Sequence, residues 1–285
     1  MTSTFRTAIL LSLLTGLLLV IGSLFGGRQG MLIAFVFAIL FNFGSYWFSD
    51  RIVLGMYRAK EADEGEYPQL YRIVRELTRA GGLPMPKVCV VPNPTPNAFA
   101  TGRNPENSAV AVTTGLLGLL TEDEIEGVLA HELAHIRNRD TLIQTVAATL
   151  AGAVMMLASM ARFAAIFGIG GRDDDGEGGI LGLLAVAIFA PIAAMVIQLG
   201  ISRGREYLAD ASGAKLSGKP ENLASALRKL GGYRPSRPIA ANPATSHLFI
   251  VNNFSGRRAF GALFSTHPPL EERIQRLSKM AGTSA

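Results

Sequence analysis

Four long apolar runs constrain this chain more strongly than any other feature of its sequence. They cover residues 7–25, 31–48, 141–161 and 179–201, and each approaches the ~20 apolar residues that a helix needs to cross a bilayer. Only 17% of the residues are charged and 49% are hydrophobic, a balance that argues against an ordinary soluble enzyme. We therefore expect a mainly α membrane protein with four transmembrane helices.

The four runs are arranged as two hairpins. A glycine-rich turn joins the first two runs, and an acidic loop at 172–178 separates the other two. Basic residues follow the second and fourth runs, and such residues are retained in the cytoplasm, so both polar segments should face it. The expected organisation is an N-terminal transmembrane hairpin (1–50), a polar segment (51–140), a second transmembrane hairpin (141–201) and a C-terminal polar segment (202–285).

Two alternatives bear on these runs. The first run could be a cleaved signal peptide, although it lacks a short hydrophobic region followed by a small-residue cleavage site. The third and fourth runs could be buried core helices, because Arg162 interrupts the third. In a membrane helix, that arginine could extend its charged end to the interface.

The second constraint is the stretch His131-Glu132-Leu133-Ala134-His135. Helix positions four apart lie on one face, so both imidazoles can bind one metal ion with Glu132 beside them. A helix is expected because Thr121 and Glu124 form a capping box ahead of an apolar stripe that runs into the motif. Two histidines on a helix can be ordinary packing residues, but two of the four histidines in this chain have this spacing.

This helix suits one zinc ion per chain. Zn²⁺ with three protein ligands keeps a fourth position for water, lowers the pKa of that water to about 7 and polarises a carbonyl. Glu132 would accept the proton of the water and pass it to the leaving amine. The motif therefore predicts hydrolysis of peptide bonds.

The third ligand is expected from the C-terminal polar segment. His135 precedes the third run and Glu206 follows the fourth, each by about one or two turns at ~1.5 Å per residue, so both would lie at one membrane surface. Asp210, one turn after Glu206, could accept the second ring N–H of a ligand histidine. A solvated polar face is the alternative for this acidic pair, and His247 and His267 are rival third ligands.

A small antiparallel sheet should precede the motif helix. The β-branched runs 87–91 and 109–113 are separated by a turn that contains proline and glycine, and Cys89, the single cysteine, should be a buried strand residue. An edge strand often binds an extended substrate through main-chain hydrogen bonds. Either 97–100 or 109–113 could supply it, although a core strand is equally consistent, and Asn97 is a candidate contact for the site or the substrate.

Three more helices and one long loop complete the expected organisation. The helices are 68–81, which starts at a proline, 219–230, and a last amphipathic helix that includes Leu277. The loop 231–264 is long enough to cover a cleft. The net charge of +5 does not indicate nucleic-acid binding, because neither an RNA-type aromatic motif nor a recognition helix accompanies the basic residues.

Three motifs stand out along the chain: His131-Glu132-x-x-His135-x-x-Asn138-x-Asp140, Arg203-x-Arg205-Glu206-Tyr207-x-Ala209-Asp210 and Thr266-His267-Pro268-Pro269-x-x-x-Arg273. Together they resemble the HtpX family of membrane metallopeptidases, which belongs to the M48 peptidases. The resemblance implies a zincin-like α+β catalytic domain built from both polar segments. It also implies a zinc endopeptidase of the bacterial inner membrane that faces the cytoplasm and acts in stress response and quality control of damaged membrane proteins.

The related CAAX prenyl endopeptidases share the three-ligand plan, and similarity to them implies that His267 and Arg273 line the active site. His267 would donate a hydrogen bond to the developing oxyanion, which is typically worth ~3 to 4 kcal/mol. Arg273 would bind the substrate backbone or pair with an acid, and a structural salt bridge is equally consistent.

Two other functions are consistent with parts of the sequence. A non-catalytic membrane scaffold could retain the metal for structure, but such a site has no use for Glu132. A small-solute transporter would need ionisable groups at midplane depth, and the apolar runs offer little besides Arg162. The expected partners are therefore peptide or membrane-protein substrates and the lipid bilayer.

Overall fold

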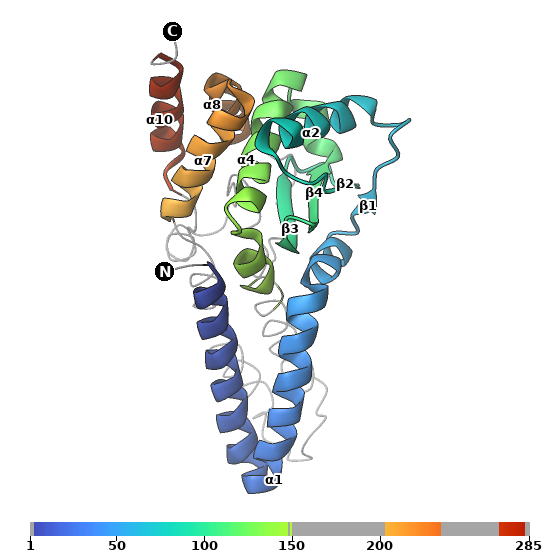
Figure 1. Ribbon diagram of the computed structural model, residues 1–285, viewed down its shortest axis with the longest axis vertical. Coiled ribbons are helices and arrows are strands. Elements are labelled where there is room, and N and C mark those ends of the chain that lie inside the picture. Colours follow the sequence, from blue (N-terminus) through green and yellow to red (C-terminus); the bar gives the residue numbers. More distant parts are fainter. Residues whose placement is uncertain (1–2, 148, 150–202, 235–267, 283–285) are drawn as a thin grey trace, which may run out of the picture.

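The computed structural model describes residues 3–147, 149, 203–234 and 268–282 (Figure 1). The expectations for the third and fourth apolar runs, the long loop after 230, and His247 and His267 lie wholly or mostly outside these residues. The described elements are α1 (Ser3–Met56), β1 (Lys60–Glu61), α2 (Pro68–Gly81), β2 (Lys87–Val91), β3 (Ala98–Asn104), β4 (Asn107–Thr113), α3 (Thr114–Leu119), α4 (Glu122–Arg137), α7 (Arg203–Ser217), α8 (Pro220–Gly232) and α10 (Leu270–Gly282).

Helix α1 reverses direction and forms a hairpin (Figure 1). Gly27, between the two apolar runs, has a φ of +53°, a conformation that glycine adopts without the Cβ clash of other residues. The two legs are in contact, since Asn42 Nδ2 donates to Thr15 Oγ1 at 2.8 Å. The hairpin projects as a stem from a head that contains the other labelled elements.

One segment of the described residues, Gly27–Phe48, is long and apolar enough to cross a membrane. Its mean hydropathy is 1.9, and only 11% of its apolar window is buried within the structure. Ile33 and Leu40 are 67% and 66% exposed, and a continuous apolar surface of this kind indicates contact with a membrane or a protein. Among the described residues, this segment is the one candidate for the four predicted transmembrane spans, and it includes the predicted run 31–48.

The four-stranded sheet is mixed, with the strand order β1-β2-β4-β3. Strand β2 runs parallel to β4, with Lys87 opposite Ala109, whereas β1 and β3 pair antiparallel with β2 and β4. The prediction of an antiparallel sheet was therefore wrong. The residues expected to form a turn include β3, and this additional strand reverses the chain before β4 begins, so β4 returns beside β2 in the same direction.

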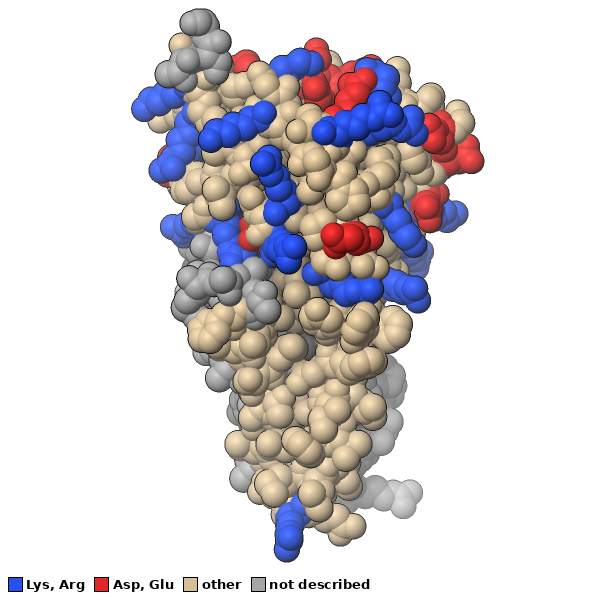
Figure 2. Space-filling view, in the orientation of Figure 1, with Lys and Arg blue, Asp and Glu red and all other residues tan. Residues whose placement is uncertain are grey.

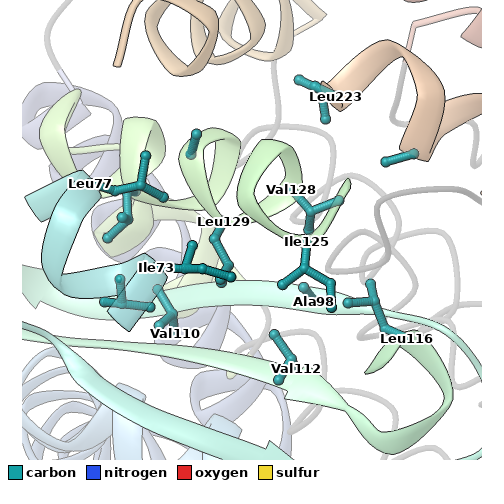
Figure 3. Packing of buried hydrophobic residues seen from close by; sticks show 14 of the residues in the cluster. Ile73, Leu77, Ala98, Val110, Val112, Leu116, Ile125, Val128, Leu129 and Leu223 are labelled. Carbon is teal, nitrogen blue, oxygen red and sulfur yellow. The ribbon is translucent and has the colours of Figure 1, made fainter. Parts of the chain in front are cut away.

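Both faces of this sheet are buried, and alternate residues of each strand belong to opposite faces. Val110 and Val112 of β4 pack against the two helices on this face, in one cluster with Ile73 of α2 and Leu129 of α4 (Figure 3). The opposite face, which includes Phe99, packs against the end of α1. Cys89 belongs to this second cluster, as predicted, and burial raises the pKa of its thiol to about 11.

Helix α4 carries the metal motif, and local residues define both of its ends. The capping box predicted from the sequence is present: Thr121 N donates to Glu124 Oε2 at 2.8 Å, and Glu124 N donates to Thr121 Oγ1 at 3.4 Å. At the other end Arg139 has a φ of +56°, and Asp140 N donates to His135 O at 2.9 Å. This is the Schellman arrangement, and it returns the chain toward the motif just after the helix ends.

Gly213 allows α7 to lie directly against the metal motif of α4. A Cβ at this position would lie 2.9 Å from the backbone of both Ala130 and His131. Side chains at positions three or four apart share a helix face, so Gly213 continues the stripe that begins with Glu206 and Asp210. The close approach of the two helices brings the acidic residues of α7 to the histidines of α4.

Gly213→Ala should therefore destabilise the protein by about 1–3 kcal/mol, the usual cost of overpacking, and weaken metal binding. Helix propensity alone would give the opposite sign, since alanine is favoured over glycine by about 1 kcal/mol. The matched control is Gly118→Ala in α3, where a Cβ meets nothing within 4 Å. Thermal unfolding and zinc content measure both effects, and equal stability of the two variants would contradict the proposed close contact.

Candidate metal centre

Helix α4 presents both motif histidines from one buried face. The Nε2 atoms of His131 and His135 are 3.2 Å apart, and the two residues are 2% and 4% exposed. The rings are nearly perpendicular, with an interplanar angle of 87°. The spacing of four residues therefore brings the two nitrogens together as the sequence predicts.

Helix α7 brings Glu206 to the same position. Its carboxylate oxygens lie 3.8 Å from His131 Nε2 and 3.4 Å from His135 Nε2, and the residue is 2% exposed. One ligand atom from each of the three residues lies within 4.8 Å of the other two. The structure thus brings together the three residues that the sequence analysis proposed as ligands.

The chemistry and spacing of these three donors fit a zinc ion. Nitrogen and oxygen donors about 2.0 to 2.2 Å from a tetrahedral zinc ion lie roughly 3.3 to 3.6 Å from one another, close to the measured separations of 3.2, 3.4 and 3.8 Å. The Nδ1 atoms of His131 and His135 face carboxylates, which favours a proton on Nδ1 and leaves the lone pairs on Nε2. Three acceptors at such distances repel one another unless a cation lies between them.

Negative charge around the centre also affects the titration of His135. Burial by itself lowers the pKa of this imidazole, but the nearby carboxylates of Asp140, Glu206 and Glu132 outweigh burial and raise the pKa to about 9. The carboxylates that hold a proton on His135 attract a metal cation for the same electrostatic reason. The surroundings of the histidines therefore favour a positive charge at the centre.

Asp210 and Arg273 form a buried pair behind His131. Asp210 Oδ1 lies 2.9 Å from His131 Nδ1, and the guanidinium of Arg273 donates to both carboxylate oxygens of Asp210 at 2.8 and 2.7 Å. Burial alone would raise the pKa of Asp210, but Arg273 lowers it to about 2. Arg273 is 1% exposed, and its Nη1 also lies 3.8 Å from Glu206 Oε2. Of the roles considered for Arg273, the structure shows pairing with an acid.

Arg273→Met should destabilise the protein by about 3–5 kcal/mol, because it leaves the carboxylate of Asp210 buried without its positive partner. The matched control is Arg276→Met, one turn later in α10, where the ion pair with Glu272 is half exposed and contributes about 1 kcal/mol or less. Urea unfolding of the zinc-loaded protein compares the two variants. If the free energy of unfolding falls by the same small amount in both variants, the buried pair does not stabilise the fold.

A second carboxylate and arginine lie behind His135, and the sequence alone did not predict a role for either. Asp140 Oδ2 is 3.6 Å from His135 Nδ1, and Arg205 Nη1 donates to Asp140 Oδ1. Asp140 follows the helix and is five positions beyond His135, so helical spacing gives no signal for this contact. The contact depends on the left-handed backbone conformation of Arg139, which directs the chain back to His135 and was not predicted from the sequence.

Glu132 is buried beside the three ligands, between α4 and β3. It is 6% exposed, and burial raises its pKa despite the opposing influence of His131, His135 and a hydrogen bond from the backbone of Ala100. A carboxylate with a raised pKa accepts protons more readily near neutral pH. Glu132 can therefore act as a base at this site.

Asn97 lies immediately before β3 and is 1% exposed. Its backbone N donates to Thr113 Oγ1 at 2.8 Å, and Thr113 N donates to its carbonyl at 2.9 Å. These bonds hold the start of β3 against the end of β4. Contact of Asn97 with a substrate stays a prediction.

Comparison with known proteins gives consistent matches. The model of peptidase family M48 matches residues 64–281. A protein named Protease HtpX homolog from Syntrophobacter fumaroxidans is 60% identical over 98% of this chain and 100% of its own length, and one of the same name from Thermococcus kodakarensis is 58% identical over 97% and 95%. A solved structure, that of S. mikatae Ste24p, has a TM-score of 0.49 and 21% identity, covering 86% of this chain and 57% of its own.

Proposed function

The chain belongs to peptidase family M48 and is a metalloendopeptidase, and from this premise we propose that it is a membrane-anchored zinc enzyme that cuts damaged membrane proteins at the cytoplasmic face. The resemblance to the HtpX family is confirmed by its relatives. The observation that supports the proposed chemistry most directly is the buried convergence of His131, His135 and Glu206 with Glu132 beside them.

We assign each side chain one role in peptide hydrolysis. His131, His135 and Glu206 would hold zinc, which when bound supplies an electrophile that polarises the scissile carbonyl. Glu132 would accept a proton from the attacking water at its carboxylate and then transfer it to the nitrogen of the leaving amine. Asp210 and Asp140 would keep the proton on Nδ1 of His131 and His135, so that both Nε2 atoms remain available as ligands.

Strand β3 would bind the extended substrate. It is the edge of the described sheet next to β4, whereas 109–113 is internal and cannot serve as the edge strand considered in the sequence analysis. The backbone N–H of Ala100 is directed to Glu132, so this edge of β3 faces the proposed base. Main-chain pairing along β3 would present a peptide bond to the site largely independently of the side chains of the substrate.

The membrane arrangement is part of the proposal. Both ends of the α1 hairpin lie toward the head (Figure 1). This arrangement supports a topology in which the start of α1 and the metal centre lie on the same side of the membrane. We propose that this side is the cytoplasm of a bacterial cell and that the membrane is the inner one. His267 lies outside the described residues, and its hydrogen bond to the oxyanion stays a prediction.

Cysteine labelling of intact cells should place the loop 172–178 opposite the metal centre. The single native cysteine, Cys89, is buried and its pKa is raised to about 11, so it contributes little background. Gly176→Cys should react with a membrane-impermeant reagent from outside, and Gly118→Cys, at an exposed position of α3, only after the cells are opened. Labelling of both from one side would contradict the four-span topology.

The decisive test is cleavage of a purified membrane protein and of a soluble peptide by the purified full-length chain. Activity should disappear with a chelator and return when zinc is added to the stripped protein. Cleavage that persists after complete removal of metal would overturn the proposed role of the centre.

A further inference from the structure

A pocket of about 690 Å³ lies at the junction between stem and head, separate from the ligand residues of the metal centre. Its volume is within the range of roughly 300–1,000 Å³ that small-molecule sites usually have. Aromatic and apolar side chains form one part of its lining and charged side chains the other. The lining includes Phe43, Trp47, Phe48, Arg51, Lys87 and Arg103.

The position of this pocket corresponds to the end of the apolar segment. Three of its aromatic residues are at the end of Gly27–Phe48, whereas Lys87 begins β2 and Arg103 belongs to β3. Figure 2 shows Lys and Arg side chains around the lower part of the head, and below them a stem that carries charge only at its far tip on the visible face. Aromatic and basic residues in this arrangement are typical of the interface between bilayer and water.

The charged part of the pocket has one more positive than negative group: Arg51, Lys87 and Arg103 against Asp50 and Glu106. Two of the cations are held over aromatic rings. The guanidinium of Arg103 lies 4.6 Å from the ring of Trp47, and that of Arg51 lies 5.8 Å from the ring of Phe48. Arg103 Nη1 also donates to Trp47 O at 3.4 Å. These contacts hold the guanidinium groups beside the aromatic part of the lining.

We propose that this pocket binds the headgroup phosphate of an anionic phospholipid. Arg51, Lys87 and Arg103 would contact the phosphate, and the exposed rings of Phe43 and Trp47, 59% and 43% exposed, would contact the first carbons of the acyl chains. A free phosphate would use the cations but leave the aromatic part without a partner, which favours a lipid. The inference rests on the proposed membrane anchoring, and the bound lipid would set the height of the head above the bilayer.

Trp47 gives a direct measurement, because it is the single tryptophan of the chain and it lines the pocket. The full-length zinc-loaded protein in an uncharged detergent is titrated with phosphatidylglycerol, phosphatidylcholine, diacylglycerol or inorganic phosphate while the fluorescence of Trp47 is recorded. We expect a saturable change with phosphatidylglycerol, weaker binding of phosphatidylcholine, and no comparable change with the other two. An equal response to diacylglycerol, or to inorganic phosphate, would overturn the assignment.

Charge-neutralising variants test the residues. Arg51→Gln and Arg103→Gln should each weaken the apparent affinity for phosphatidylglycerol about fivefold, as expected for one basic residue near an anionic surface. Arg79→Gln, at an exposed position of α2 outside the pocket, is the matched control. Arg51 does not contact Trp47 in the way Arg103 does, so its variant remains informative if Arg103→Gln folds poorly. Unchanged affinity of Arg51→Gln would overturn the proposal.

Two further measurements separate this inference from the proposed function. Flotation with phosphatidylcholine liposomes tests membrane anchoring, and cleavage of a soluble peptide tests the metal centre. If the protein floats with liposomes and cleaves the peptide, but the fluorescence of Trp47 responds equally to all the lipids, the headgroup site alone is refuted. If it does not float, the membrane anchoring itself is refuted.

Discussion

Replacing Glu132 with glutamine will remove most of the peptide cleavage while leaving zinc binding intact. Glutamine preserves the shape of the side chain but cannot accept the proton, so the contribution of the base to kcat, typically about 10²- to 10⁴-fold, is lost. The raised pKa of Glu132, caused mainly by burial, suits proton acceptance near neutral pH. Cleavage of a fluorogenic peptide and elemental analysis of the same preparation measure the two properties.

The control for this variant is Glu126→Gln on the same helix. The carboxylate of Glu126 pairs with Lys219 at 2.8 Å and is not among the ligand residues, so its replacement should change the rate little. A Glu132→Gln protein that cleaves as fast as the original chain would exclude Glu132 as the base. A protein that has lost its zinc would show that Glu132 supports the metal rather than the proton transfer.

Glu206→Ala will reduce zinc affinity by more than about 100-fold. Removal of a residue that only orients a ligand typically costs 10- to 100-fold in metal affinity, and Glu206 is expected to be a ligand itself. The remaining His131 and His135 then provide two nitrogens, fewer than the three protein ligands of a catalytic zinc site. Competition with a chromophoric chelator measures the affinity of the purified protein.

Asp140→Asn provides the graded comparison. Asp140 contacts His135 from behind, so its replacement should cost between 10- and 100-fold in zinc affinity, and added zinc should restore its cleavage activity. The same addition should not restore Glu206→Ala. If Glu206→Ala binds zinc no more weakly than Asp140→Asn, Glu206 is not the third ligand.

Local sequence was sufficient for the elements that carry the histidines. The capping box at Thr121 and Glu124 is present as predicted, because it depends on residues three positions apart in one chain segment. The convergence of His131 and His135 follows from helical spacing alone. The position of Glu206 needed one more step, the assumption that the chain crosses the membrane twice between the motif and α7.

The order and direction of the strands in the sheet could not be predicted from local sequence. The β-branched runs identified β2 and β4 but did not show which strands are neighbours. Most of β3 was assigned to the turn between them, and this strand makes β2 and β4 parallel. Pairing depends on contacts between residues distant in the sequence. The local pattern around a proline-rich turn does not record those contacts.

The amino-acid sequence by itself determined the apolar stem, the motif helix and the chemical identity of the metal donors, because each depends on composition or on spacing within one segment. Only the tertiary structure decided how those donors are oriented and held. The left-handed turn at Arg139 directs Asp140 to His135, and the missing side chain of Gly213 lets α7 approach α4. The bidentate pair of Arg273 and Asp210 joins α10 to α7. These contacts either join segments that are far apart in the sequence or involve residues beyond the end of a helix. Sequence periodicity therefore does not predict them.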